Sequence, residues 1–176
     1  MTIWTTTTPS PLGPITLAKS ALGLCGLHLP GEAPTAAAAR SSWRRDDAAF
    51  ADERALLDAY FAGEPARFAP LAPAGTPFQL EVWRALGAIP FGATISYGEL
   101  ARRLGRAGSA RAVGAANARN PIAIAIPCHR VVGHDGRLVG YAGGVAAKRW
   151  LLEHERAVAA TGALLEHERR AARQVA

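Results

Sequence analysis

Cysteine is almost absent from this chain of 176 residues, which contains only Cys25 and Cys128. Two cysteines cannot form the disulfide framework of a small secreted protein, and they could supply at most two ligands of a metal site. The start of the chain, Met1–Trp4, lacks the basic and apolar regions of a signal peptide. No apolar stretch reaches the roughly 20 residues that a membrane-spanning helix needs. These absences predict a cytoplasmic protein with a free thiol at Cys128 and no membrane contact. We also expect no bound metal and no cofactor.

Lysine is equally scarce, because Lys19 and Lys148 are the only two among 20 lysine and arginine residues. The formal net charge of +6 is therefore carried almost entirely by arginine. Guanidinium groups bind phosphate through paired hydrogen bonds and stack on bases, so this balance is compatible with a nucleic-acid partner. It is also compatible with a GC-rich genome, and the charge alone does not decide between these explanations.

The first 72 residues are predicted to form a small domain of strands and one helix. Residues 3–30 alternate strand-like runs with turn signals, and apolar residues in 46–63 fall at helical spacing. We predict a weakly ordered loop over residues 31–45, which are rich in alanine, proline and serine. Residues 64–75 contain several prolines and show no periodicity, so we place a linker between two domains there.

The chain from residue 76 onward is predicted to be mostly helical. Thr76 and Pro77 are typical of a helix start, because threonine caps the first turn and proline tolerates the first helical position. Two further helices are predicted, from Ser96 or Tyr97 to Leu104 and from Ser109 to about Arg119, with a glycine-containing turn between them. This order is the helix-turn-helix pattern, and basic residues gather around it. They are Arg102, Arg103, Arg106, Arg111, Arg119, Arg130 and Arg137.

The second of these helices is made mostly of small residues. Small side chains are typical of a helix that packs tightly against a neighbour. They would also let the backbone approach a nucleic-acid groove, with Arg111 projecting from the surface. The residues alone leave both interpretations open.

The stretch Ile122–Val132 contains the most reactive side chains of the sequence. An apolar run ends at Pro127, and Cys128 and His129 follow directly. We predict a strand, a tight turn and a helix, with Cys128 near free backbone N–H groups that favour the thiolate. His129 could accept the thiol proton. A free cysteine is usually a small buried apolar residue, but the charged and glycine-rich surroundings here favour a reactive one.

A glycine-rich hairpin is predicted over residues 132–141, followed by a helix from Val145 to about Arg156. The segment Leu151–Arg156 recurs as Leu164–Arg169. A solenoid needs about three or more copies, so we interpret residues 157–176 as a helical C-terminal extension.

These motifs resemble the O6-alkylguanine-DNA alkyltransferases, also called methylated-DNA–protein-cysteine methyltransferases. The resemblance covers about residues 3–156 and rests on Pro127–Val131, Arg111–Gly114, Asn120–Pro121, Tyr141–Gly144, Ser10–Gly13 and Ile95–Tyr97. It implies an α+β fold with two domains. The N-terminal domain, residues 1–72, would be a small α/β unit with an antiparallel sheet and a helix, similar to ribonuclease H. The C-terminal domain, residues 76–156, would be mostly helical and winged-helix-like, and would contain the helix-turn-helix.

The resemblance also implies a reaction. The second helix of the helix-turn-helix would enter the minor groove of double-stranded DNA. Cys128 would accept the alkyl group of O6-alkylguanine, and by extension of O4-alkylthymine, after the base leaves the stack. His129 would act as the base through a water molecule, and Glu155 would orient His129. Tyr97 would donate a proton toward the departing guanine, and Asn120 would join the recognition helix to the active-site turn. Because the product is a thioether, one turnover per molecule is expected.

Further residues are assigned by the same resemblance. Arg111 would fill the space that the extruded base leaves. The residues implied in DNA binding are Tyr97, Ser109, Ala110, Arg111, Ala112, Ala115 and Arg119. The residues implied in the substrate pocket are Val131, Tyr141, Ala142 and Gly143. The protein would be a monomer in solution, with contacts between neighbouring molecules left open for the DNA-bound state.

One branch of this family binds a structural zinc through N-terminal cysteine and histidine side chains. Here Ser20 and Cys25 stand where that set has cysteine and histidine, so no zinc is expected. The pair Cys25 and His28 is better interpreted as a packed thiol and an imidazole at the edge of a strand.

Three other functions compete with alkyl transfer. A lesion-binding relative without catalysis would lack the cysteine, and Cys128 is present. A transcriptional regulator that senses damage at Cys128 would need side chains that read base edges, and the alanine-rich helix offers few of them. A cysteine hydrolase or redox enzyme would have no need of Arg111.

Overall fold

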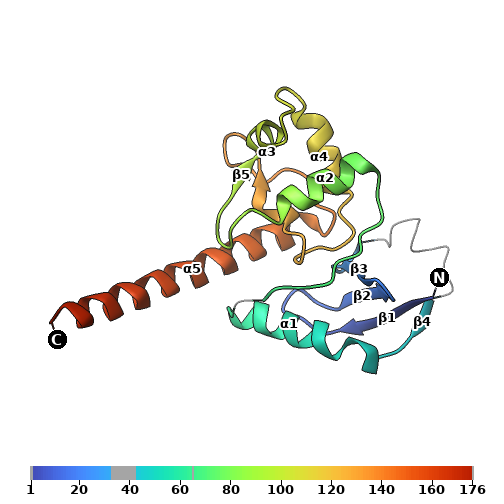
Figure 1. The fold of residues 1–176 in the computed structure, drawn as a ribbon, viewed down its shortest axis with the longest axis horizontal. Coiled ribbons are helices and arrows are strands. Elements are labelled where there is room, and N and C mark those ends of the chain that lie inside the picture. The colour runs from blue at the N-terminus through green and yellow to red at the C-terminus, as the bar shows by residue number, and fades with distance from the viewer. Residues whose placement is uncertain (1, 33–42, 65, 176) are drawn as a thin grey trace.

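The computed structural model describes residues 2–32, 43–64 and 66–175, and it describes side chains as far as residue 162. An N-terminal domain built on a sheet is joined to a C-terminal domain built on helices (Figure 1). This architecture confirms the predicted α+β fold class. Within the described ranges, no helix combines the length and the apolar character that crossing a lipid bilayer requires.

A four-stranded sheet with the order β3-β2-β1-β4 forms the base of the N-terminal domain. The elements of this domain are β1 (Ile3–Thr8), β2 (Ile15–Ser20), β3 (Gly23–His28), β4 (Trp43–Arg45), the 3-10 helix η2 (Ala48–Phe50) and α1 (Ala51–Ala62). Strand β2 pairs antiparallel with both β1 and β3. Phe50 and Leu57 from the helical segment share one buried core with Ile15 and Leu17 from β2, so α1 covers one face of the sheet.

The prediction of an irregular loop over residues 31–45 is wrong at its end. Trp43–Arg45 forms β4, which pairs parallel with the first residues of β1, beginning at Ile3. Asp46 extends this pairing by donating its N–H to the carbonyl of Thr5 at 3.1 Å. A three-residue edge strand is too short to show an alternating pattern, and only the long-range partner β1 defines it. Residues 33–42 of the predicted loop lie outside the described residues.

The C-terminal domain contains the predicted helix-turn-helix. Its elements are α2 (Pro77–Leu86), β5 (Ile95–Ser96), α3 (Tyr97–Arg103), α4 (Ala110–Ala118), the 3-10 helix η3 (Cys128–Arg130), β6 (Val131–Val132) and α5 (Gly144–Val175). Thr76 and Gln79 form a reciprocal capping box at the start of α2, and the Ser96 hydroxyl accepts the Glu99 N–H at the start of α3. Ser109 occupies the N-cap position of α4, but its side chain makes no capping hydrogen bond.

The apolar run Ile122–Ile126 is not the predicted strand. Only Ile122 forms a bridge, with Leu27 of β3. The chain then turns, because the Ile126 N–H donates to the Ile122 carbonyl at 2.9 Å and Ile124 adopts a φ of +65°. The helix predicted after Pro127 is also absent, since only the three-residue η3 forms there.

The free edge of β3 joins the two domains through backbone hydrogen bonds. Leu24 donates to the Pro70 carbonyl at 3.0 Å, and Leu27 donates to the Pro121 carbonyl at 2.9 Å. The Leu27 carbonyl in turn accepts the Ala123 N–H at 2.9 Å. The segment that leads to Cys128 is thus fixed directly to the N-terminal sheet.

Helix α5 is much longer than the helix predicted from Val145 to about Arg156. It continues without a break to Val175, and its C-terminal half projects away from both domains (Figure 1). The side chains of the second copy of the repeat, Leu164–Arg169, lie outside the described residues.

Candidate active site

Two short parallel strands bring the predicted active-site residues together. Strand β5 pairs with β6 through Ile95 opposite Val131 and Ser96 opposite Val132. Tyr97 follows β5 directly, and Cys128 lies one turn before β6. The start of α3 and the cysteine turn are therefore neighbours, although they are separated by about thirty residues in sequence.

The side chain of Asn120 shapes the turn that carries Cys128. Its Oδ1 accepts the Ile122 N–H at 3.0 Å, and its Nδ2 donates to the Ile126 carbonyl at 2.8 Å. The same Nδ2 lies 3.0 Å from the Sγ atom of Cys128. Asn117 of α4 adds a hydrogen bond from its Nδ2 to the Cys128 carbonyl at 3.3 Å. The helix-turn-helix and the cysteine are thus linked through two asparagine side chains.

The expectation that the fold favours a Cys128 thiolate is wrong for the free protein. Cys128 is buried, and this burial raises the pKa of its thiol to about 11, although the Asn120 hydrogen bond opposes the change. A single 3-10 turn supplies too few aligned peptide groups to offset the loss of hydration. At pH 7 about one molecule in 10⁴ carries the thiolate, so deprotonation of the free thiol costs about 5 kcal/mol at this pH. A base would therefore have to remove this proton before the sulfur could act as a nucleophile.

His129, the residue after Cys128, forms a fully buried pair with Glu155. The Nε2 atom of His129 lies 2.8 Å from Oε1 of Glu155, and both side chains are inaccessible to solvent. Arg130 donates to both oxygens of Glu155, at 2.8 Å and 2.9 Å, and Gly92 donates its N–H to Oε2 at 3.0 Å. Burial alone would raise the pKa of Glu155, but the hydrogen bonds and charges of His129 and Arg130 hold it at about 2. Glu155 is therefore a carboxylate throughout the working pH range.

The ionised Glu155 fixes the tautomer of His129. A carboxylate only accepts hydrogen bonds, so the neutral imidazole must carry its proton on Nε2. The Nδ1 atom then presents a lone pair, and among the described residues it has no hydrogen-bond partner. Burial lowers the pKa of His129, against the opposing effect of Glu155. His129 is therefore a neutral base whose free nitrogen is Nδ1.

Lys148 is a buried cation beside the cysteine turn. Its Nζ donates to the carbonyls of Val131 at 2.6 Å and Val139 at 3.3 Å. The same Nζ lies 5.9 Å from the ring centres of both Tyr97 and Tyr141. Burial lowers the pKa of Lys148, and the positive charge of Lys148 in turn lowers the pKa of Cys128. Lys148 thus links β6 to the loop before α5 by hydrogen bonds, and its charge partly offsets the rise that burial causes in the pKa of Cys128.

The two tyrosines differ in their surroundings. Tyr97 is half-buried, and burial together with the charge of Cys128 raises the pKa of its phenol, so it remains protonated at neutral pH. The hydroxyl of Tyr141 is buried beside Cys128 and has no hydrogen-bond partner of good geometry among the described residues. Both phenols can therefore donate a proton or a hydrogen bond to a bound group.

The residues predicted for the substrate pocket lie around the end of this loop. Val131 is buried, Tyr141 and Gly143 are half-buried, and Ala142 is exposed. A Cβ atom at Gly143 would lie 2.8 Å from Leu29 and 3.2 Å from a carboxylate oxygen of Glu32. The N-terminal domain therefore packs closely against this part of the site, and burial raises the pKa of Glu32 to about 7.

Helix α4 presents a thin exposed face next to the site. The exposed residues are Arg111, Ala112, Ala115, Ala118 and Arg119, whereas Ser109 and Ala110 are half-buried. On the opposite side, Val113, Ala116 and Asn117 are buried. A Cβ atom at Gly114 would lie 3.5 Å from the Tyr97 ring, which is an ordinary van der Waals distance. Helix α4 therefore has a packed inner face and an exposed outer face made mostly of alanine, and groove binding by that outer face stays a prediction.

Sequence reasoning missed the role of several buried polar residues, namely Tyr60, Asn117, Arg130 and Lys148. A signal for one of them was available in α5. Lys148, Leu151, Leu152 and Glu155 share one helical stripe, and all four are buried. Two charged residues on an otherwise apolar stripe indicate a buried polar site, because unpaired charges are rarely buried.

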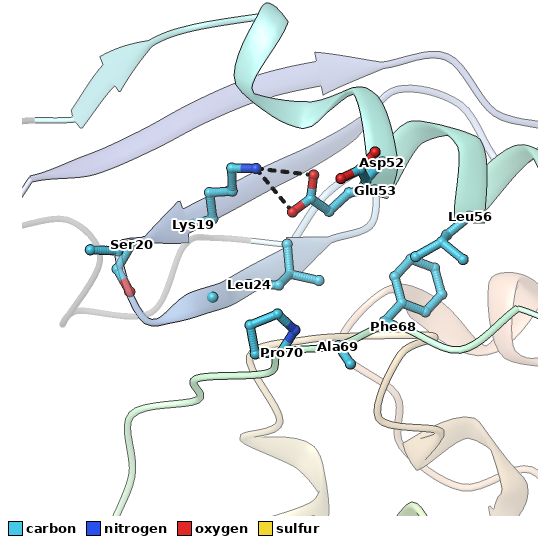
Figure 2. A pocket seen from close by; sticks show the side chains of 11 residues that line it. Lys19, Ser20, Leu24, Asp52, Glu53, Leu56, Phe68, Ala69 and Pro70 are labelled. Atoms are coloured by element: carbon cyan, nitrogen blue, oxygen red, sulfur yellow. Dashed lines mark hydrogen bonds and ion pairs between the residues drawn. The ribbon is translucent and has the colours of Figure 1, made fainter.

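A hollow of about 270 Å³ in the N-terminal domain has no relation to these residues. It lies between β2, β3, α1 and the segment before α2, with Leu24, Leu56 and Phe68 in its wall (Figure 2). Its Lys19 and Glu53 neutralise each other at 3.1 Å. Within the described ranges, no group of three or more histidine, cysteine or acidic residues is arranged to hold a metal ion.

Comparison with known proteins gives two family matches that together cover most of the chain. Residues 3–72 match the model for the ribonuclease-like domain of 6-O-methylguanine DNA methyltransferase, and residues 77–157 match the model for its DNA-binding domain. A methylated-DNA–protein-cysteine methyltransferase of Mycobacterium leprae is 50% identical over 148 residues, covering 84% of this chain and 88% of the relative.

Solved structures agree with these matches. The crystal structure of Mycobacterium tuberculosis OGT in complex with DNA is 46% identical, has a TM-score of 0.80, and covers 90% of this chain and 94% of its own. The structure of the Mycobacterium tuberculosis O6-methylguanine methyltransferase is 47% identical, also with a TM-score of 0.80, and covers 88% and 93% of the two chains.

Proposed function

This chain belongs to the 6-O-methylguanine DNA methyltransferase family, and from that premise we propose that it repairs DNA by moving the alkyl group of O6-alkylguanine onto Cys128. O4-alkylthymine is a second expected substrate. The partner is double-stranded DNA that contains the alkylated base, bound by a monomer. The observation that carries the proposal is a buried thiol, held by Asn120, whose next residue in the chain is a histidine held by a buried carboxylate.

The first step removes the proton of Cys128. The free Nδ1 of His129 takes this proton through an intervening water molecule, and Glu155 stabilises the resulting imidazolium. The buried carboxylate prevents His129 from turning, so Nδ1 keeps its direction. This relay supplies the thiolate, which the raised pKa of the buried thiol otherwise disfavours. A thiol with a raised pKa also reacts slowly with other electrophiles.

The second step is a displacement at the alkyl carbon. The thiolate sulfur forms a bond to that carbon while the bond between the carbon and guanine O6 breaks. The departing guanine takes a proton from Tyr97, whose phenol is protonated at neutral pH. The proton on His129 then restores Tyr97 through solvent, so that a neutral guanine and an S-alkylcysteine remain. No group in the described site can cleave this thioether, and we expect one turnover per molecule.

DNA binding is assigned to the exposed face of α4. A shallow, alanine-lined surface can enter a groove without reading base edges, which suits a protein that must repair a lesion in any sequence. Arg111 projects from this face and would occupy the place of the extruded base. Arg119 at the end of the helix would contact phosphate. Specificity then comes from the pocket around Val131 and Tyr141 rather than from the groove.

The proposal is tested by a stoichiometric assay. Increasing amounts of a duplex with one O6-methylguanine are incubated with the protein, and the repaired guanine is counted per protein molecule. We expect the yield to stop at one. The Cys25→Ala variant should give the same yield, and the Cys128→Ala variant should give none while still binding the duplex. Repair well beyond one equivalent, or repair by Cys128→Ala, would refute the proposal.

A further inference from the structure

Among the described residues of the N-terminal domain, Tyr60 is the one whose side chain forms a hydrogen bond with the buried His129–Glu155 pair. Tyr60, on the last turn of α1, donates its hydroxyl to Oε1 of Glu155 at 2.8 Å. Only 4% of Tyr60 is exposed. Its ring meets Phe61 and Phe91 edge-on, with centroid distances of 5.4 Å and 6.0 Å, so packing fixes the direction of the hydroxyl.

A second contact joins the same turn of α1 to α5. The carbonyl of Tyr60 accepts a hydrogen bond from Nε2 of His154 at 2.9 Å. His154 is the neighbour of Glu155 in sequence, and its ring stacks on Trp150. Both the side chain and the backbone of Tyr60 therefore hold the part of α5 that carries Glu155.

The hydroxyl of Tyr60 and the imidazole of His129 share one oxygen atom. Oε1 of Glu155 accepts from Tyr60, from His129 and from Arg130. Each donor neutralises part of the carboxylate charge, and the charge that remains stabilises the protonated form of His129. A donor at this oxygen therefore lowers the proton affinity of His129, although it has no contact with the imidazole ring.

The charged and titratable groups that face His129 come from three elements. Glu155 and Lys148 belong to α5, Arg130 belongs to the turn of His129 itself, and Tyr60 belongs to α1. Glu155 raises the pKa of His129, whereas Arg130 and Lys148 add to the lowering that burial causes. Burial beside Glu155 raises the pKa of the Tyr60 phenol far above neutrality, so Tyr60 is a neutral donor at every working pH.

We propose that Tyr60 is a positioning residue for alkyl transfer, by which the N-terminal domain orients Glu155 and keeps His129 unprotonated. This inference rests on the proposed function, in which His129 is the base. It gives the N-terminal domain a part in the reaction, although the cysteine, the histidine and the DNA-binding helix all belong to the C-terminal domain.

The first test measures the pKa of His129 by NMR in the wild-type protein and in Tyr60→Phe. Phenylalanine keeps the ring and its packing and removes only the donor. We expect the pKa of His129 to rise by about one pH unit, because Glu155 regains charge for the imidazolium. An unchanged value would overturn the proposal. This titration does not depend on alkyl transfer, so it decides the role of Tyr60 even if the proposed function fails.

The second test compares single-turnover transfer rates from an O6-methylguanine duplex between pH 5.5 and 8.5. The ratio of the Tyr60→Phe rate to the wild-type rate should fall as the pH falls, toward a limit of about one tenth below the wild-type pKa of His129. Above pH 8 the two rates should stay within about threefold, because the acid limb moves to higher pH by about one unit. A purely structural role would lower the rate by the same factor at every pH. Phe50→Leu is the control, since it removes a buried aromatic ring at the start of the same helix, ten residues before Tyr60. Its rate should differ from wild type by the same factor at every pH.

A third protein tests the sign of the effect without removing the hydroxyl. Replacing Tyr60 by 3-fluorotyrosine makes the phenol a stronger donor and keeps the fold. The pKa of His129 should then fall by a few tenths of a pH unit, opposite to the change in Tyr60→Phe. A rise, or no change, would contradict the proposal, and this result stands even if Tyr60→Phe is too unstable to measure.

Discussion

The buried Glu155 carboxylate should make the stability of this protein strongly dependent on pH. Five hydrogen bonds converge on Glu155, from Tyr60, Gly92, His129 and two nitrogens of Arg130. Burial would raise the pKa of Glu155, but the histidine and arginine partners outweigh it and lower the pKa from 4.5 to about 2. This difference in the pKa of Glu155 between the unfolded and folded states contributes about 3 kcal/mol to the free energy of unfolding at neutral pH.

Because folding lowers the pKa of Glu155, the contribution of Glu155 to stability decreases as the pH falls. The unfolded chain takes up a proton on Glu155 as the pH falls through 4.5, whereas the folded protein resists until about pH 2. The stabilisation is therefore complete above about pH 5 and is lost as the pH falls toward 2. Glu155→Gln removes the charge, keeps the shape, and leaves Arg130 without a counter-charge. We expect it to lower the free energy of unfolding by about 3 kcal/mol at pH 7 and by less than half of that at pH 3.

Urea unfolding followed by tryptophan fluorescence at both pH values measures this difference. Groups that have no contact with Glu155 titrate equally in the two proteins, so their contributions cancel. The pKa of His129 depends on Glu155, so His129 is titrated by NMR in both proteins and its contribution is subtracted. Glu81→Gln is a suitable control, because Glu81 pairs with Arg106 at 2.9 Å on the exposed surface. Glu81→Gln should lower the free energy of unfolding by less than about 1 kcal/mol at both pH values. A Glu155→Gln cost that is equal at pH 7 and pH 3 would refute the assignment of Glu155 as a buried carboxylate.

Three further predictions concern the reacting groups and the DNA. Alkylation of free Cys128 by iodoacetamide should rise about tenfold per pH unit from pH 7 to 9, because burial raises its pKa to about 11, and a plateau near pH 7 would contradict this. Lys148→Met should slow transfer from the duplex at pH 7 by about tenfold, since a cation that favours the thiolate is lost, whereas Lys19→Met on the N-terminal sheet should not. Arg111→Ala should slow transfer from a duplex by about tenfold or more while leaving transfer from the free alkylated base unchanged. The control Arg149→Ala, an exposed position on α5, should change neither rate, and an equal loss with both substrates in Arg111→Ala would rule out a role in base extrusion.

The helix-turn-helix and the motif around Cys128 could be predicted from local signals in the sequence. Thr76 and Ser96 mark the helix starts because each caps its own first turn, and such interactions depend only on neighbours in sequence. The motif from Pro127 to Val131 identified the family by resemblance. Both kinds of information lie within short stretches, so the sequence alone was enough.

Features that depend on distant partners were missed or predicted wrongly. Strand β4 is defined by its pairing with β1. The run Ile122–Ile126 turns because the Asn120 side chain hydrogen-bonds to the Ile122 N–H and the Ile126 carbonyl, which a neighbouring strand would otherwise pair. The pKa of Cys128 depends on how deeply the folded chain buries it, and a sequence pattern contains no measure of burial. Tyr60 and Glu155 are 95 residues apart in sequence, and only the packing of α1 against α5 reveals their contact.

Transfer of the alkyl group to Cys128 is best tested by intact-protein mass spectrometry with peptide mapping, after incubation with a duplex that contains one O6-methylguanine. We expect one added methyl group, on the peptide that contains Cys128, with Cys25 unmodified. An unmodified protein that still binds the lesion tightly would rule out this transfer and would indicate a sensor of damage rather than a repair protein.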